Sequence, residues 1–237
     1  MSKVYASPAE QVRNLFDGKA AGWPAKYAPD GPLAGRLQTL QTITARLVPA
    51  GGWVLDLGCG TGEIARELAA VGMHVAGCDI SAQMLRTAAA RGPEARWVQL
   101  PPSWEHLPFR SCAFDALIAS SVLEYVTDPL AVLNECSRVL HPRGVLLATV
   151  PDTRHPIRWL EALAAAAERT VPERPTGRRW QGYRAYLRTS RQRHPARWWL
   201  GAARTAGLCP VRGMAPDRPA PLRMLVLRHI GSAGSGQ

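Results

Sequence analysis

Short apolar runs separated by helical segments fill the middle of the chain. The run Trp-Val-Leu-Asp-Leu at 53–57 predicts a strand that is buried on both faces, and a helix over about 61–72 should follow it. The same alternation predicts further strands at 74–79, 96–100, 114–120 and 144–150, and helices at 82–91 and 129–140. Apolar strands that alternate with helices predict a mostly parallel, doubly wound sheet.

Both ends of the chain depart from this alternation. Residues 1–50 predict helices, the first of which starts at a capping box, Ser7 to Glu10, with Pro8 at the first helical position. Residues 151–206 look helical and are rich in Arg and Trp, and two final strands are predicted at 207–213 and 222–229. The small, polar residues 231–237 predict a disordered tail.

These patterns predict a single α/β domain over 1–230. It comprises a helical cap (1–50), a Rossmann-like core (51–150), a helical lid inserted after the fifth strand (151–206) and the last two of seven strands (207–230). A chain of 237 residues with 46% hydrophobic content can bury one sizeable core.

The cysteines and the apolar segments bear on the location of the protein. The five cysteines are scattered singly without a C-x-x-C pair, so we predict reduced thiols and no metal site. No run is long enough for a membrane helix, and Met1 to Glu10 lack the apolar core of a signal peptide. We therefore expect a cytoplasmic protein.

The positive charge is concentrated in the last third of the chain. Residues 151–237 hold 16 arginines and five acids, which accounts for the whole formal net charge of +11. Arginine suits bidentate capture of carboxylate or phosphate. An anionic small acceptor, peripheral contact with an anionic membrane and RNA are therefore all candidate partners, and RNA is the least favoured because no added RNA-binding module is evident. The sequence does not fix the oligomeric state.

The strongest chemical signal is a glycine-rich stretch, Asp56-Leu57-Gly58-Cys59-Gly60-Thr61-Gly62, between a predicted strand and a helix. Glycines let the backbone approach a ligand closely. The third glycine of the dinucleotide fingerprint would fall on Glu63, whose charge also disfavours a phosphate there. The pattern thus argues against a nicotinamide-dependent oxidoreductase. It suits a ligand with an ammonium group and no pyrophosphate.

The next strand ends in a second acid, Asp79, whose carboxylate can accept two hydrogen bonds from a ribose diol. Together with this acid, several stretches make the chain resemble class I S-adenosylmethionine (SAM)-dependent methyltransferases. They are Val54 to Ile64, Val75 to Ser81, Leu107 to Phe109, Phe114 to Pro129 and Arg138 to Gly144. The resemblance is closest to the methyltransferase type 11 branch typified by ubiquinone- and menaquinone-biosynthesis enzymes.

The resemblance implies SAM as cofactor, S-adenosylhomocysteine (SAH) as product, and a role for each matching residue. The methionine part of SAM would be held by Asp56, Gly58, Cys59, Gly60, Gly62 and Ser120. Asp79 would bind the ribose, and Ile80 and Met84 would line the adenine. Ser103 stands where the family often has an acid for the adenine amino group, and Trp104 beside it can stack on the ring. Apart from the resemblance, residues 1–36 are expected to fold over the cofactor, because Phe16, Trp23, Tyr27 and Arg36 offer large or charged groups for it.

Methylation of an oxygen usually also needs a base. Glu124 and Tyr125 follow the fourth predicted strand, and Asp152 and His155 follow the fifth, so all four are candidates at the edge where doubly wound sheets bind ligands. O-methylation of a small molecule or glycan precursor is the leading hypothesis. An RNA methyltransferase that grips RNA through 151–206 and a non-catalytic SAM-binding protein remain alternatives.

Overall fold

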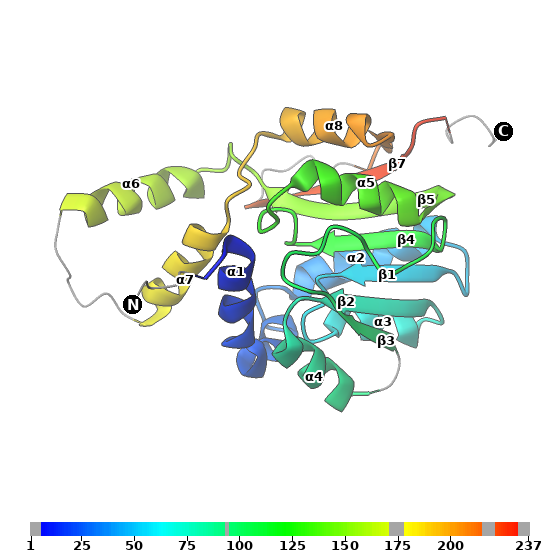
Figure 1. Ribbon diagram of the computed structural model, residues 1–237, viewed down its shortest axis with the longest axis horizontal. Coiled ribbons are helices and arrows are strands. Elements are labelled where there is room, and N and C mark those ends of the chain that lie inside the picture. Colours follow the sequence, from blue (N-terminus) through cyan, green and yellow to red (C-terminus); the bar gives the residue numbers. More distant parts are fainter. Residues whose placement is uncertain (1–5, 93–94, 171–177, 215–220, 232–237) are drawn as a thin grey trace.

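A seven-stranded sheet with helices on both faces forms the centre of the molecule (Figure 1). The structure is a computed structural model that describes residues 6–92, 95–170, 178–214 and 221–231. Apart from its first residue, the predicted tail over 231–237 lies outside the described residues. Within this part of the chain, no helix combines the length and apolarity needed to cross a bilayer.

The strand order is β3-β2-β1-β4-β5-β7-β6. The strands are β1 (Trp53–Leu57), β2 (His74–Asp79), β3 (Ala95–Gln99), β4 (Phe114–Ser120), β5 (Leu140–Pro151), β6 (Leu208–Pro210) and β7 (Leu222–His229). The first five pair in parallel, and β7 runs antiparallel to both β5 and β6. The predicted fold class, a Rossmann-like, mostly parallel sheet with a helical insertion after the fifth strand, is confirmed.

Three of the helices begin at residues whose side chains cap them. The helices are α1 (Pro8–Asp17), α2 (Ala34–Leu47), α3 (Glu63–Ala70), α4 (Ala82–Ala90), α5 (Pro129–Val139), α6 (Ile157–Thr170), α7 (Arg178–Thr189) and α8 (Ala196–Thr205), with two 3-10 turns, η1 (Ala20–Gly22) and η2 (Pro24–Tyr27). The side chains of Ser7, Ser81 and Asp128 accept backbone N–H groups in the first turns of α1, α4 and α5.

Neighbouring residues of the central strands divide the core into two layers. Leu55, Leu117 and Leu146 pack on one face of the sheet, where α5 and the fully buried Trp199 of α8 cover them. Their neighbours in the same strands pack on the other face, and these are Val54, Ile118 and Leu147. Leu40 of α2 and Ile64 of α3 belong to this second layer. Because both faces are covered, the open carboxyl edge of the strands is where a ligand can bind.

Three boundaries differ from the prediction. The helix predicted over 61–72 begins at Glu63 because Gly62 takes a left-handed conformation with φ +80°. The helix predicted over 129–140 ends at Val139, and β5 already starts at Leu140, since Pro142 disfavours continued helix. The strand predicted at 207–213 is only Leu208–Pro210, and Pro210 lacks the N–H that a longer ladder would use.

Segments from both ends of the sequence gather beyond one end of the strands. Helices α1 and α7 contact each other there, and α6 extends away from the body of the molecule (Figure 1). The end of α1 is fixed to the start of α4, because the Asp17 carboxylate accepts hydrogen bonds from the Ser81 hydroxyl at 2.6 Å and the Gln83 N–H at 3.3 Å. The cap and the insertion therefore cover the same edge of the sheet.

Candidate functional site

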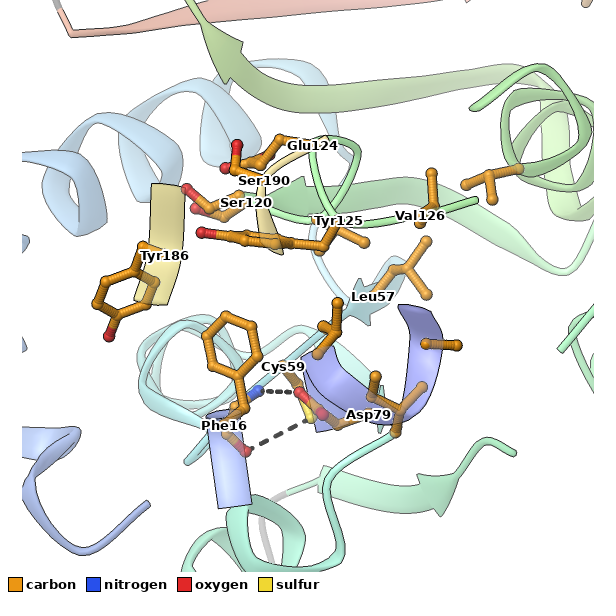
Figure 2. A pocket seen from close by; sticks show the side chains of 18 of the residues that line it. Phe16, Leu57, Cys59, Asp79, Ser120, Glu124, Tyr125, Val126, Tyr186 and Ser190 are labelled. Atoms are coloured by element: carbon orange, nitrogen blue, oxygen red, sulfur yellow. Dashed lines mark hydrogen bonds between the residues drawn. The ribbon is translucent and has the colours of Figure 1, made fainter. Parts of the chain in front are cut away.

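A cavity of about 910 Å³ opens at the carboxyl ends of β1, β2, β4 and β5. Side chains of α1, η2, α6 and α7 close its outer side. Figure 2 shows Asp79 at one end of this space and Ser120, Glu124 and Ser190 at the other, with Phe16, Tyr125 and Tyr186 between them. The two ends differ in chemistry.

The glycine loop after β1 forms the floor of the cavity. Gly58 has φ +69°, and a Cβ atom there would lie 2.4 Å from Cγ2 of Val122, so only glycine fits. Gly58, Cys59 and Gly60 line the cavity, whereas Gly62 does not. A Cβ at Gly62 would meet the Trp97 ring at 2.5 Å, which gives this glycine a packing reason of its own. Bare backbone thus faces the ligand space at Gly58 and Gly60.

Asp79 ends β2 beside this loop. Its carboxylate accepts the Gly60 N–H at 2.9 Å and the Ser81 N–H at 2.8 Å, which leaves acceptor capacity on both oxygens. Burial raises the pKa of Asp79 to about 6, against the effect of these backbone hydrogen bonds. The side chain is fixed in position and can accept two hydrogen bonds from a ligand.

Asp56 lies behind the loop and does not line the cavity. It is buried, and neither carboxylate oxygen has a hydrogen-bond partner among the described residues. Burial raises its pKa well above the ordinary value, and the nearby charges of Asp79 and Glu63 raise it further. Asp56 and Asp79 together give this end of the cavity an excess of acidic groups.

The other end of the cavity holds two polar groups that the protein leaves unpartnered. Ser120 Oγ and Glu124 Oε2 are buried and have no hydrogen-bond partner in the described part of the chain. Glu124 is 3% exposed, and burial raises its pKa to about 7. Nearby, Arg36 donates to Ser121 Oγ at 3.0 Å. A ligand in the cavity can supply the hydrogen bonds that these groups lack.

Aromatic rings form the wall between the two ends. Phe16 of α1 makes edge contacts with Trp23, Tyr125 and Tyr186, with ring centroids 5.5, 5.3 and 6.1 Å apart. Burial raises the pKa of Tyr125 and that of Tyr186, and the pKa of Tyr186 reaches about 12. Both hydroxyls therefore stay protonated. Trp104 and Ser103, from the loop before Leu107, line the cavity as well.

Helices α6 and α7 are fastened together through Glu161. Its carboxylate is paired with Arg158 at 2.7 Å and Arg193 at 2.8 Å, and the Tyr183 hydroxyl donates to it. Burial alone would raise the pKa of Glu161, but the hydrogen bonds from Tyr183, Arg158 and Arg193 outweigh it and lower the pKa. This cluster holds the outer wall of the cavity.

The structure brings most of the predicted site residues together but leaves four of them outside the cavity lining, two of which are Asp56 and Gly62 behind the loop. Tyr27, Arg36, Ile80, Met84, Ser103, Trp104, Ser120, Glu124 and Tyr125 line the same cavity as Asp79 and the glycine loop. Asp152 and His155 do not. Asp152 pairs with Arg223 at 3.3 Å and caps the turn at Arg154, and the His155 Nδ1 accepts the Ile157 N–H at 3.3 Å. Both therefore have structural partners outside the cavity.

The sequence analysis missed several residues of the wall. Lys26, Arg158, Glu161, Ser190 and Arg193 line the cavity, although none was among the predicted site residues. For Lys26 one signal was available, since lysine occurs at only three positions of this Arg-rich chain. The others lie in an insertion with no motif, so only their spatial arrangement identifies them.

Comparison with known proteins identifies the core. Residues 55–148 match the model of a methyltransferase domain. The ubiquinone biosynthesis O-methyltransferase of Xanthomonas axonopodis pv. citri is 34% identical over 144 residues, 58% of this chain and 60% of that protein. That of Xylella fastidiosa is 29% identical over 157 residues, 63% of this chain and 64% of that protein. Over its core, the chain is thus similar to methyltransferases, among them O-methyltransferases of ubiquinone biosynthesis.

The fold agrees with this similarity. The magnesium protoporphyrin IX methyltransferase of Synechocystis, solved with bound SAH, superposes with a TM-score of 0.68 at 18% identity, over 92% of this chain and 98% of that one. At this identity the likeness concerns the fold alone. The chain spans about three fifths of the length of the curated relatives that it matches.

The cavity has groups that fit SAM, the cofactor that the resemblance to methyltransferases implies. Bare backbone at Gly58 and Gly60 leaves room for a ligand at the loop, and Asp79 retains free acceptor sites for two ribose hydroxyls. Asp56 is buried behind the loop and has no hydrogen-bond partner in the described part of the chain, and a sulfonium or ammonium group nearby would favour its ionised form. Arg36 can meet the methionine carboxylate.

Proposed function

We propose that the protein transfers the methyl group of SAM to an oxygen of a small-molecule acceptor. The observation that carries this proposal is Glu124, a buried carboxyl with an unpartnered oxygen, in the same cavity as Asp79. A carboxyl with a pKa of about 7 suits a general base near neutral pH. The names of the curated relatives, O-methyltransferases of ubiquinone biosynthesis, support the same reaction class.

In this proposal the cofactor occupies the end of the cavity nearest Asp79. Asp79 accepts the ribose hydroxyls, Ile80 and Met84 contact the adenine, and Ser103 and Trp104 border it. The methionine part lies on Gly58, Cys59 and Gly60 and reaches Ser120, with Tyr27 and Arg36 above it. Asp56 and Gly62 act from behind the loop, through charge and backbone conformation. A volume of about 910 Å³ is near the upper limit for one small ligand, so an acceptor can fit beside SAM.

SAM supplies a methyl group on a sulfonium that is already a good leaving group, and SAH is the product. The chain contributes alignment of the acceptor and exclusion of water. Phe16, Tyr125 and Tyr186 hold the acceptor between the cofactor and the outer wall. As the acceptor oxygen forms its bond to the methyl carbon, Glu124 takes the hydroxyl proton, and the Tyr125 hydroxyl stays protonated as a hydrogen-bond donor.

The test has two independent readouts. Calorimetric titration with SAH measures cofactor binding, and Asp79→Ala should weaken it by roughly 100-fold, since two charge-assisted hydrogen bonds are lost. Incubation with labelled SAM and fractionated cell extract then shows which molecular class gains label. We expect label on a small molecule or glycan precursor that bears a hydroxyl. SAH binding without transfer to any fraction, or label only on RNA, would refute the proposal.

A further inference from the structure

The cavity contains a lysine without a counter-ion. Lys26 lies in η2 and lines the cavity, and in the described part of the chain no carboxylate lies within ion-pair distance of its Nζ atom. Its Nζ atom donates a hydrogen bond to the Tyr186 hydroxyl at 3.0 Å and lies over the Trp23 ring, 3.9 Å from the ring centroid. One hydrogen bond leaves two of the three N–H groups of the ammonium free for a ligand.

The charges around Lys26 are positive as well. Lys19 Nζ also lies over the Tyr186 ring, 4.6 Å from its centroid, and the charges of Lys19 and Arg36 act on Lys26. Burial, followed by these two charges, lowers the pKa of Lys26 to about 8, so the ammonium form still dominates at neutral pH. SAM brings a further net positive charge, because it has two cationic groups and one carboxylate. An anion would relieve this accumulation of charge.

The other cations of the wall are already engaged. Arg158 and Arg193 are both paired with Glu161, and Arg36 contacts Ser121 at the end of β4, beside the cofactor. Only Lys26 therefore remains for an acceptor among the cavity-lining cations named here. A phosphate would favour the planar fork of an available arginine, whereas one ammonium with an adjacent tyrosine hydroxyl suits a carboxylate.

The rings around this lysine indicate the shape of the acceptor. Phe16, Tyr125 and Tyr186 meet edge to face, and both Tyr186 and Glu124 line the cavity, as Figure 2 shows with Tyr125 between them. Such a wall suits a flat aromatic ring. We infer that the acceptor is an aromatic hydroxy acid whose carboxylate binds Lys26 and the Tyr186 hydroxyl while its hydroxyl faces Glu124. This inference rests on the proposed function and adds the substrate class.

A matched pair of probes tests this inference. 3,4-Dihydroxybenzoate and 3,4-dihydroxybenzamide differ mainly in charge, and their binding to the SAH-loaded protein can be compared by calorimetry. We expect the benzoate to bind roughly 10-fold more tightly or better, the size of one charge-assisted hydrogen bond. Lys26→Met should abolish this preference while SAH affinity stays within about threefold, and Lys26→Arg should retain it. Lys19→Met removes the same charge outside the cavity lining and should keep most of the preference.

The outcomes separate this inference from the proposed function. Equal binding of both compounds, no binding of the benzoate, or a preference that survives Lys26→Met overturns the assignment of Lys26. A large loss of SAH affinity in Lys26→Met also overturns it, because the lysine would then serve the cofactor carboxylate. If the protein methylates neutral acceptors only, the proposed function stands, but the inference that the acceptor is an acid is wrong. If SAH does not bind at all, the proposed function itself fails.

Discussion

Glu124 lies in surroundings that favour its neutral form. The carboxyl is buried, and one of its oxygens receives no hydrogen bond from the residues that the structure describes. Only the ionised form can take a proton from an acceptor, so the same burial that makes Glu124 a stronger base also limits how much of it is ionised at neutral pH. Two consequences of this compromise can be measured, one on the rate and one on the stability.

The rate should depend on pH through Glu124. Because its pKa is about 7, kcat/KM should rise as pH increases through 7 and level off above 8. Glu124→Gln should remove this dependence and lower kcat by roughly 100-fold. Steady-state rates with saturating SAM between pH 5.5 and 9 measure both effects. Asp152→Asn, at a candidate base that the structure places outside the cavity, should keep the profile of the parent protein.

The stability of the cofactor-free protein should respond in the opposite direction. In the folded state Glu124 has a pKa of about 7 in place of 4.5, so folding stability falls as pH rises from about 4.5 through about 7. Glu124→Gln should therefore be neutral near pH 4.5 and stabilising by up to roughly 3 kcal/mol at pH 8. Urea denaturation at the two pH values measures the difference. The exposed Glu105→Gln serves as control, and an equal gain at both pH values would contradict the assignment to ionisation.

How far the residues of the site could be predicted depends on whether a motif marks them. Asp79 was recognisable because it ends an apolar strand next to a glycine-rich loop, and both features are local. Asp152 also follows a strand, but its partner Arg223 is 71 positions away, and no pattern near either residue shows that they pair. Lys26 and Tyr186 are 160 positions apart. Contacts at such separations are decided by packing of whole elements.

At the scale of elements, the loop between β1 and α3 combines two constraints. Gly58 needs a left-handed backbone, and it also needs empty space, because Val122 of the β4–α5 connection lies against it. The first constraint was implied by the glycine pattern. The second was not, since it depends on how closely two loops approach each other.

Substitutions can separate these two effects. Gly72 has a similar φ of +86° with nothing within 4 Å of a built Cβ, so Gly72→Ala should cost only about 1 kcal/mol of stability. Gly58→Ala adds a clash with Val122 Cγ2 and should cost roughly 2–4 kcal/mol and weaken SAH binding. Thermal unfolding and calorimetry measure the two losses. The double variant Gly58→Ala, Val122→Ala should recover part of both, and its failure to do so would show that backbone conformation alone matters.

Element type was easier to predict than element boundary. The alternation of apolar runs identified all five parallel strands, because four of them are largely buried and the remaining one, β3, lies between two predicted helical or loop segments. Their ends depend on single residues such as Gly62 and Pro142, which act on the backbone over one or two positions. The antiparallel direction of β7 could not be predicted from its sequence, since the apolar pattern of Leu222–His229 suits a strand that runs either way.

At the scale of the whole molecule, the outer wall of the site is built from two distant segments, the N-terminal helices and the insertion after β5. Glu161 connects α6, α7 and the segment after α7 through Arg158, Tyr183 and Arg193. Glu161→Gln should loosen this wall, so we expect the KM for the acceptor to rise by roughly 10-fold while SAH affinity stays the same. Kinetics and calorimetry on the same sample measure the two. Glu67→Gln, on the outer side of α3, is the control, and a parallel loss of SAH affinity would contradict a role limited to the acceptor side.

The hydrogen bond between Asp17 and Ser81 has a consequence for the order of events in catalysis. Ser81 also donates its backbone N–H to Asp79, so α1 is tied to the residue that would clasp the ribose. Ala9, Val12 and Phe16 of α1 line the cavity, so α1 would lie over a nucleoside held at Asp79, and an acceptor would have to reach the cavity from another side. Turnover would then follow a compulsory sequence: the donor arrives first, the acceptor enters and leaves in methylated form, and the spent donor departs last.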